Sequence, residues 1–511
     1  MSSNEVYKDM DPSLFEFASR DGEIRDTKFE TKARGYLADA LVRFKKNRAS
    51  VIGAWIILAL LLYSVISPIL SPYTINDRDK YYVNYPPFVR WIADLHIGIF
   101  DGGAIHESQN EVSMAQWRAV AEETGMDPVL KILGTTTTVS MYRGQERVSV
   151  TYKIKTNKYY EQGMIFRVFS YEDFEKIQQY QNETGIQIIY PYVESSDIQD
   201  INNANIWYKV SDSRGTPVYD ADGNFIPAYS KNKAKEGAPY NSIRIEGDDG
   251  SYIYSMQKSG AVQCRICYYN YYTYVYGHEP MFLMGTNSMG MDLFGAIGIG
   301  SRFSLIFALL VSVINLTLGA IYGSIQGYYG GAVDMLMDRF ADLLAGVPFT
   351  VVTVLFQLHL APKVGIVPSF LFAFVSTGWL GMAALTRKQF YRFKGQEFVL
   401  AARTLGASDK RLMFKHVFPN SLGTIVTSCA LVIPSVIRSE TTLTYLGIVN
   451  IQDFAGTTLG TLMSQGQTSM TSSPHAMFFP ALYFALLLIS FNLFGNGLRD
   501  AFNPSTRGVE D

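Results

Sequence analysis

The sequence predicts an α-helical polytopic membrane protein with six membrane-spanning helices and an α+β domain inserted between the first two. Three observations support this fold class. Six stretches are apolar over about the length of a bilayer crossing, whereas residues 71–280 contain no such stretch. Hydrophobic residues make up 48% of the 511 residues, yet the mean hydropathy is only +0.06, so lipid-facing and water-facing parts are both present.

The first apolar run, residues 50–70, follows a polar tail, residues 1–49, that ends in Arg43, Lys45, Lys46 and Arg48. Basic residues favour the cytoplasmic side, so the tail is expected inside, with the run as an uncleaved anchor leading outward. Twenty apolar helical residues cover about 30 Å, the thickness of the hydrocarbon core.

Five further runs are expected within a membrane core at residues 281–500. They lie at about 303–323, 343–360, 367–385, 423–445 and 476–494. Six crossings that begin inside also end inside, which predicts a cytoplasmic tail at residues 501–511. The expected location is therefore the plasma or inner cell membrane, with both termini cytoplasmic.

Residues 71–280 are expected on the outer face, with an α+β domain from about 105 to 277. Period-two alternation predicts strands at about 147–155, 186–192 and 243–256, and residues 171–180 (YEDFEKIQQY) favour a helix. Asp222 and Gly223 indicate a hairpin turn.

The same stretch is rich in tyrosine, above all at residues 268–277 (YYNYYTYVYG). These rings are expected either to pack the domain and lie near the lipid headgroups, or to form a contact surface for a peptide or an extracellular binding protein. Cys264 and Cys267 are three residues apart in this region. No second pair of potential zinc ligands accompanies them, so a local disulfide or two free thiols are favoured over a metal site.

Several functional classes are disfavoured by the sequence. A formal net charge of -2 without long runs of one sign gives no reason to expect nucleic acid as a partner. The chain has no G-x-x-x-x-G-K-[ST] motif, no G-x-S-x-G motif and no H-E-x-x-H motif, and its six histidines are scattered. We therefore expect a protein that is not an enzyme and that binds no cofactor or metal itself.

Charged residues near the membrane are candidates for functional roles, because an ionisable group in hydrocarbon is costly. Asp334, Asp338 and Asp342 recur every four residues, and Arg339 is expected to pair with the last two. These four residues indicate either a solvated helix start or a contact with partner subunits. Candidates for the translocation path or its gate are Arg438, Glu440 and Asp292; for the first two, snorkelling to the interface is the alternative.

Residues 396–419 form an amphipathic, basic segment between two apolar runs. On a helix that begins near Glu397, one apolar stripe is formed by Phe398, Ala401, Ala402 and Leu405. Gly406 is expected to break this helix, and Ser408 to cap a second short helix that Pro419 ends. The segment is expected in the cytoplasm because of eight basic residues between the fourth and fifth runs: Arg387, Lys388, Arg392, Lys394, Arg403, Lys410, Arg411 and Lys415.

The spacing of Ala401-Ala402, Gly406 and Phe418-Pro419 resembles the EAA loop of ABC importer permeases, a cytoplasmic coupling element that docks in a cleft of the ATPase subunit. Leu400 stands where that family usually has Glu, which implies one polar contact fewer. On this loop alone, an interfacial amphipathic helix is the alternative. The coupling residues that the resemblance implies are Glu397, Leu400, Ala401, Ala402, Arg403, Gly406, Lys410, Arg411, Phe418 and Pro419.

Further segments resemble the C-type permease subunit of oligopeptide and dipeptide ABC importers over about residues 1–100 and 279–508. They are the N-terminal tail leading into residues 44–62 (FKKNRASVIGAWIILALLL), and residues 285–294 (GTNSMGMDLF), 327–349 (GYYGGAVDMLMDRFADLLAGVPF), 439–448 (SETTLTYLGI) and 491–504 (FNLFGNGLRDAFNP). Asn287 and Met291 depart from the Asp and Arg that are common in that branch. The outer domain is longer than the family's usual loop, and the resemblance says nothing about its role.

The resemblance implies a fold of the ABC importer permease type and a subunit that forms half of a translocation pathway. Implied partners are a homologous second permease, two ATPase subunits that hold ATP and Mg, and an extracellular or periplasmic peptide-binding protein. Two alternatives remain: a nickel or other small-solute ABC permease, and a membrane-anchored receptor with an external binding domain. A receptor has no need for a helix-Gly-helix element in a basic inner loop.

Overall fold

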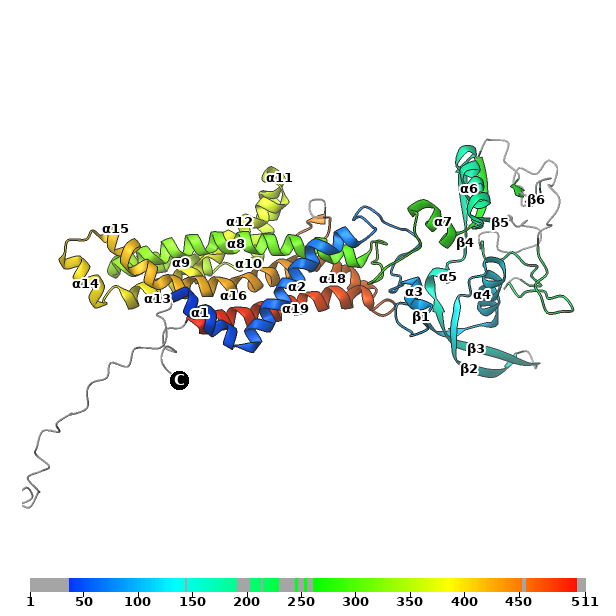
Figure 1. Cartoon of the computed structure of the whole chain (residues 1–511), viewed down its shortest axis with the longest axis horizontal. Coiled ribbons are helices and arrows are strands. Elements are labelled where there is room, and N and C mark those ends of the chain that lie inside the picture. Colours follow the sequence, from blue (N-terminus) through cyan, green and yellow to red (C-terminus); the bar gives the residue numbers. More distant parts are fainter. Residues whose placement is uncertain are drawn as a thin grey trace, which may run out of the picture.

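The computed structural model describes residues 36–142, 145–190, 203–212, 215–228, 244–246, 252–254, 261–452 and 456–502. A long bundle of helices occupies one end of the molecule, and strands with shorter helices occupy the other (Figure 1). Most of the predicted inner tail and the last nine residues lie outside the described residues, as does most of the predicted strand at 243–256.

The bundle begins with α1 (Tyr36–Lys46) and α2 (Arg48–Leu70). The Asn47 side chain caps α2 by accepting a hydrogen bond from the Ser50 N–H at 3.3 Å. Five helical runs are long and apolar enough to cross a membrane: α2, α8 (Leu293–Tyr329), Ile366–Phe393, Asp409–Tyr445 and α19 (His475–Phe502). The run Ile366–Phe393 consists of α12 (Ile366–Gly378) and α13 (Leu380–Phe393).

The predicted span at about 343–360 is not one continuous helix in the structure. This segment begins in the last turn of α9 (Gly331–Ala345) and continues in α10 (Phe349–His359), and the two helices are bent by 72°. Pro348 disfavours helical geometry at Val347, which ends the first helix. Because the 11 residues of α10 cover only about 17 Å, α10 reaches the length of a bilayer only together with α9. The described residues therefore contain five candidate spans, or six if this bent pair is one span.

Helix α8 extends well beyond the predicted 303–323, because Asp292 caps one end and Gly330 ends the other with φ +67°. Its glycines let α13 approach closely. A Cβ atom on Gly323 would lie 2.2 Å from the Ala383 carbonyl oxygen, and one on Gly327 would lie 2.7 Å from the Phe390 Cβ. Small residues spaced by four are typical of such membrane-helix contacts.

The bundle is completed by short helices and a long one: α11 (Ala361–Val364), α14 (Glu397–Thr404), α15 (Asp409–Arg411), a π-helix (Leu412–Val417), α16 (Phe418–Tyr445) and α18 (Leu459–Thr468).

Between α2 and α8, the described residues form antiparallel sheets. The three-stranded sheets have the orders β1-β3-β2 and β4-β8-β5, and β6 pairs with β7. The strands are β1 (Gly103–Gln109), β2 (Val129–Tyr142), β3 (Gln145–Asn157), β4 (Met164–Ser170), β5 (Ile189–Tyr190), β6 (Arg244–Glu246), β7 (Tyr252–Tyr254) and β8 (Ala261–Cys267). The helices are α3 (Arg90–Ala93), α4 (Glu111–Thr124), α5 (Lys158–Glu161), α6 (Tyr171–Thr184) and α7 (Tyr268–Tyr276).

An aromatic cluster joins this region to the bundle. Tyr82 and Tyr159 are fully buried, and their rings lie 5.0 Å apart. In α7, Tyr268, Tyr269, Tyr271 and Tyr272 are buried in the same cluster. For these four rings the structure favours packing over an exposed contact surface.

Cys264 and Cys267 are both free and buried on β8. Residues three apart on a strand are separated by about 10 Å at Cα and point to opposite faces, which excludes a disulfide between them. Of the two predicted alternatives, free thiols are therefore correct. Burial raises the pKa of Cys264 to about 12 and that of Cys267 to about 11.

Candidate functional site

The predicted coupling segment lies at the end of the bundle farthest from the sheets (Figure 1). Helix α14 ends at Thr404, and Gly406 follows with φ +80°. The Gly406 N–H donates to the Arg403 carbonyl at 3.0 Å, and the Ala407 N–H donates to the Ala402 carbonyl at 3.1 Å. A Cβ on Gly406 would meet no atom within 4 Å, so the left-handed backbone, and not space, requires glycine here.

The apolar stripe predicted on α14 is mostly exposed. The helix buries Val399 completely, against a cluster that includes Phe390, Leu412 and Val417. Ala402 packs partly against this cluster, whereas Phe398 is 42% exposed and Leu405 is 87% exposed. An eight-residue helix at the bundle end contacts protein on one side only. Phe398 and Leu400 are exposed on its other side, Leu405 is exposed just past its end, and Phe414 is exposed on the π-helix; we call these four exposed side chains the exposed apolar patch.

The prediction that Pro419 ends the second helix is wrong. The helical run continues from Asp409 through the π-helix into α16 and ends at Tyr445. Pro419 stands in the first turn of α16. The wider π turn before it provides the space that a proline ring needs at the carbonyl four residues earlier. Ser408 occupies the predicted cap position, but its side chain makes no capping hydrogen bond.

Helix α8 holds this segment through its last residues. The Tyr328 hydroxyl donates to Asp409 Oδ1 at 2.6 Å and lies 3.3 Å from Arg403 Nη2. Lys394 Nζ donates to the Gly327 carbonyl at 2.9 Å. Arg403 therefore anchors the loop to α8. The other polar coupling candidates, Glu397, Lys410 and Arg411, are exposed, as are Ala401 and Pro419, while Phe418 is half-buried.

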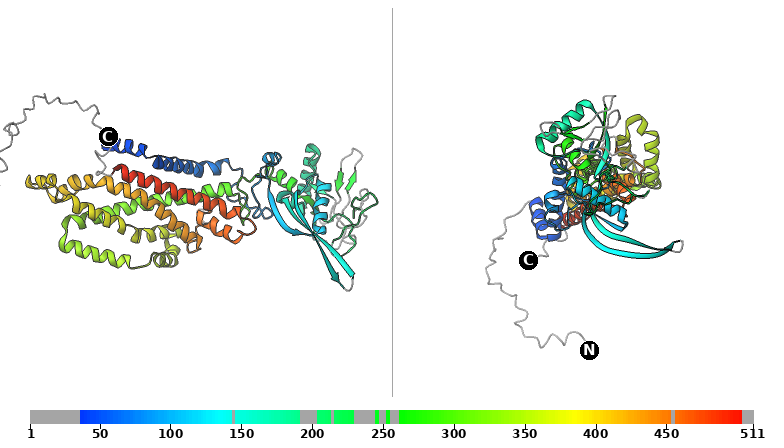
Figure 2. Two further views of the ribbon diagram at one scale, coloured as in Figure 1. Left: turned by 90° about the horizontal axis from the view of Figure 1, so that it is seen from below. Right: turned by 90° about the vertical axis from the view of Figure 1, so that its right-hand side faces the viewer.

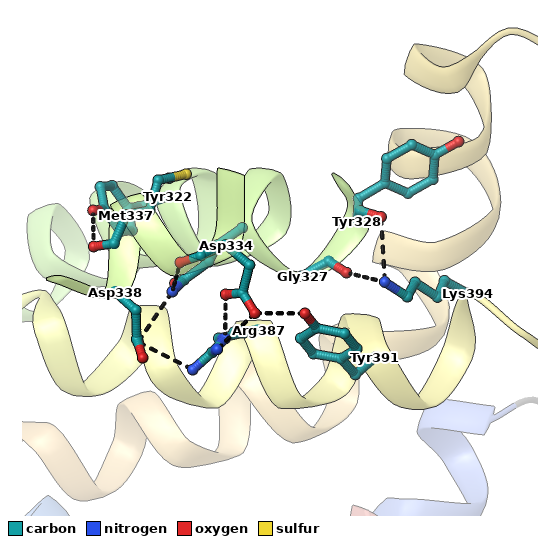
Figure 3. Close-up of polar contacts among 10 residues, drawn as sticks. Tyr322, Gly327, Tyr328, Asp334, Met337, Asp338, Arg387, Tyr391 and Lys394 are labelled. Carbon is teal, nitrogen blue, oxygen red and sulfur yellow. Dashed lines mark hydrogen bonds and ion pairs between the residues drawn. The ribbon is translucent and has the colours of Figure 1, made fainter. Parts of the chain in front are cut away.

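A polar network lies behind the segment and joins α9 to α13 (Figure 3). Arg387 binds Asp334 in a fork: Nε lies 2.6 Å from Oδ1, and Nη2 donates to Oδ2 at 2.7 Å. The Tyr391 hydroxyl donates to the same Oδ2 at 2.6 Å. Arg387 Nη1 also donates to Asp338 Oδ1 at 3.0 Å, and Gln326 Nε2 donates to that oxygen at 3.2 Å.

This network corrects the predicted pairing of Asp338 with Arg339. Asp338 pairs with Arg387, whereas Arg339 pairs with Asp342 at 3.2 Å, as predicted. Two spacings in the sequence could have revealed Arg387 as a partner. Asp334 and Asp338 are four residues apart on one helix, and Arg387 and Tyr391 are four apart on another, so each pair presents its groups on a single face.

The three candidates for the translocation path lie apart. Asp292 caps α8 and accepts a hydrogen bond from the Ser71 hydroxyl at 2.7 Å. Glu440 is fully buried between α16 and α8, where it accepts from the Ser304 hydroxyl at 2.7 Å and from Thr441 at 3.2 Å. Arg438 is exposed. Within the described part of the chain, no hydrogen bond or ion pair joins any two of the three.

Two family models match parts of this chain. The family described as "Binding-protein-dependent transport system inner membrane component" matches residues 315–508, and the "N-terminal TM domain of oligopeptide transport permease C" matches residues 35–87. In a structure titled "Inward facing conformations of the MetNI methionine ABC transporter", one chain is similar with a TM-score of 0.32 at 12% identity, over 41% of this chain and 96% of that one.

Two similar relatives come from Bacillus subtilis (strain 168). The oligopeptide transport system permease protein OppC is 39% identical over 223 residues, which cover 44% of this chain and 72% of OppC. The dipeptide transport system permease protein DppC is 34% identical over 224 residues, which cover 44% of this chain and 68% of DppC. The chain therefore belongs to the binding-protein-dependent transport permeases and is a multi-pass membrane permease subunit of an ABC importer.

Proposed function

We propose that this subunit imports oligopeptides or dipeptides, together with a homologous second permease. Two ATPase subunits, which hold ATP and Mg, dock from the cytoplasm, and an external binding protein delivers the substrate. The relatives described above are named as oligopeptide and dipeptide permeases, which supports a peptide substrate. A nickel permease and a membrane-anchored receptor are not favoured.

The exposed apolar patch on the coupling segment carries this proposal. Leu405 is 87% exposed, Phe414 is 49% exposed, and Leu400 is 46% exposed, all within a stretch rich in basic residues. A patch of this kind with a polar rim is typical of a protein contact. The basic residues favour a cytoplasmic location for it, and with it the termini inside and the sheets outside.

The anchors of the segment explain how it can transmit motion. Val399 fixes α14 to the bundle, Tyr328 joins the segment to α8, and the second half of the segment is the beginning of α16. ATP binding in the docked ATPases would move the segment as a rigid body and shift the permease between inward-open and outward-open states. Asp292, Arg438 and Glu440 remain candidates for the path or gate.

The test is copurification with the ATPase subunits, followed by peptide-stimulated ATPase activity and uptake. Gly406→Asp should abolish ATP-driven uptake while the protein stays in the membrane, because it adds a charge and strains the left-handed backbone. Gly406→Asn should keep more uptake, since Asn tolerates this conformation and is neutral.

Gly395→Asp is the matched control. A Cβ atom on Gly395 would also meet no atom within 4 Å, but the φ of Gly395 is not positive, so this variant adds the same charge without the same backbone strain. Normal uptake by Gly406→Asp, or a purified chain that captures no ATPase, would contradict the docking proposal.

A further inference from the structure

Strands β2 and β3 form a ribbon that projects away from the other strands (Figure 2). β1 pairs with β3 only from Asn157 to Tyr152, whereas β2 and β3 stay paired as far as Tyr142 and Gln145. Beyond Tyr152 the ribbon is therefore two-stranded, and both of its edges lack a neighbouring strand among the described residues. Isolated two-stranded ribbons of this kind are marginally stable in water.

The register of the ribbon separates its side chains into an apolar face and a hydroxyl face. Cross-strand partners share a face, and alternate residues along a strand return to it. One face carries the pairs Thr137–Val150, Val139–Val148 and Met141–Glu146, and the opposite face carries Thr136–Thr151 and Thr138–Ser149. We call the first set the ribbon face.

The ribbon face continues the buried face of β3 but is itself uncovered. Ile154 on the same side of β3 is fully buried, whereas Val148 is 60% exposed, Val139 is 59% exposed and Met141 is 70% exposed. Its one charged residue is Glu146, near the tip. Exposed apolar side chains on an unsupported ribbon indicate a surface that another molecule covers.

A cavity of about 470 Å³ lies at the base of the ribbon face. Tyr152 of β3 lines it together with Val112, Met114 and Arg118 of α4 and with Pro217 and Tyr219, and Glu111 and Thr216 add polar groups to its wall. Arg118 is already paired, since its Nε donates to Glu122 at 2.8 Å and its guanidinium lies 5.2 Å from the Phe225 ring. The cavity therefore suits an apolar or aromatic side chain, of the kind that anchors protein interfaces.

We propose that the ribbon face and this cavity together form the docking surface for the external binding protein of the importer. This inference rests on the proposed function, which requires such a protein on the outer side. The surface lies at the opposite end of the molecule from the coupling segment, beyond the helix bundle (Figure 1). This position separates it from the ATPases and from the bilayer around the bundle.

Photo-crosslinking in the assembled importer tests the occupant. A benzophenone amino acid at Val139 or Val148 reports on the ribbon face, and the same probe at Thr138 or Ser149 reports on the opposite face of the same strands. With a purified binding protein that supports uptake by this importer, we expect a crosslink from the first pair and little from the second. A crosslink from Val139 to the second permease, to another copy of this chain or to lipid would overturn the proposal, as would equal labelling from both faces.

Affinity for the binding protein gives a second measurement. The double variant Val139→Thr and Val148→Thr keeps side-chain shape and strand preference but makes the ribbon face polar, and should weaken binding about tenfold. Val112→Phe, which fills part of the cavity, should weaken it as well. Thr138→Val with Ser149→Thr on the other face is the control and should leave the affinity unchanged.

Basal ATPase activity should be normal in all of these variants, which shows that the importer is folded and assembled. Unchanged affinity in both the ribbon-face and cavity variants would overturn the docking surface. The Gly406→Asp importer should still bind the binding protein, so a failure of the coupling segment and a failure of the docking surface give different results.

Discussion

Arg265 and Arg387 both bind carboxylates, the first among the sheets and the second behind the coupling segment, and their surroundings differ. Arg265 on β8 pairs with Glu123 of α4, with side-chain exposures of 0% and 8%, and its Nε also donates to the Ala204 carbonyl at 2.5 Å. Arg387 on α13 pairs with Asp334 and Asp338 of α9; the side chains of Arg387 and Asp338 are 29% and 46% exposed, whereas that of Asp334 is 11% exposed.

The two sets of ion pairs differ in how easily they can be broken: the Arg265 pair is a fixed connection, and the Arg387 pairs can rearrange. Breaking a buried pair leaves an unpaired charge away from water, at a cost of about 3–5 kcal/mol, so Arg265 and Glu123 hold β8 and α4 together permanently. A partly exposed pair exchanges its partners for water at a cost of about 1 kcal/mol or less. Helices α9 and α13 can therefore separate or shift, which suits a part of the chain that moves during transport.

The largest expected effect follows from breaking the buried pair. Glu123→Gln should destabilise the region of the sheets by about 3–5 kcal/mol, because the buried Arg265 loses the Glu123 carboxylate. Hydrogen exchange of β8 in the purified protein measures this loss. A double variant, Glu123→Leu with Arg265→Met, should recover much of the stability; protection of β8 that is equal in Glu123→Gln and the wild type would contradict the comparison.

The second largest effect is expected on uptake. Asp334→Asn removes the charge that Arg387 and Tyr391 share, and should lower uptake about tenfold while changing unfolding stability by about 1 kcal/mol or less. Uptake and unfolding are measured on the same preparation. Asp342→Asn is the control, because Asp342 and its partner Arg339 are 63% and 78% exposed. A stability loss as large as that of Glu123→Gln would show that the two pairs are equivalent.

A smaller effect is expected at the contact between α8 and the coupling segment. Tyr328→Phe removes the hydroxyl that donates to Asp409 and lies beside Arg403, which is worth about 1 kcal/mol. The ratio of peptide transported to ATP hydrolysed should fall about threefold, with basal hydrolysis unchanged. An unchanged ratio would remove Tyr328 from the coupling path.

The smallest effect is expected on the reactivity of the two β8 cysteines toward thiol reagents. Burial raises the pKa of Cys264 to about 12 and that of Cys267 to about 11, so the reactive thiolate is scarce at neutral pH. N-ethylmaleimide should leave both thiols unmodified near neutral pH in the folded wild type and modify them once Glu123→Gln loosens β8. Rapid modification of the wild type would contradict our inference that the buried Arg265–Glu123 pair holds the region of the sheets rigid.

Composition predicted the membrane helices because crossing a bilayer needs a run of apolar residues, and such runs are visible in the sequence. A change in the direction of a helix is not visible in the same way. The run at 343–360 is apolar throughout, but it contains the 72° bend between α9 and α10. Pro348 was the residue that could have indicated this bend, but glycines and prolines in membrane helices are usually tolerated without such a bend.

Contacts between segments that are distant in the sequence were harder to predict than the helices themselves. The exposed Gly406 turn follows from local chemistry, whereas Arg387 meets Asp334 only because Gly323 and Gly327 bring α13 against α8. Strand β3 covers the predicted strand at 147–155, because its residues alternate in polarity. Its partner β2 was missed, since residues 135–138 are four consecutive threonines without alternation.

The helical run from Asp409 to Tyr445 has a mechanical consequence. Its 37 residues extend over about 55 Å, from the base of the Gly406 turn, through the π-helix and Pro434, and past the buried Glu440. A rotation imposed at Phe414 can therefore travel along one continuous helix as far as Glu440, and it passes to α8 through the hydrogen bond that the Ser304 hydroxyl donates to the Glu440 carboxylate.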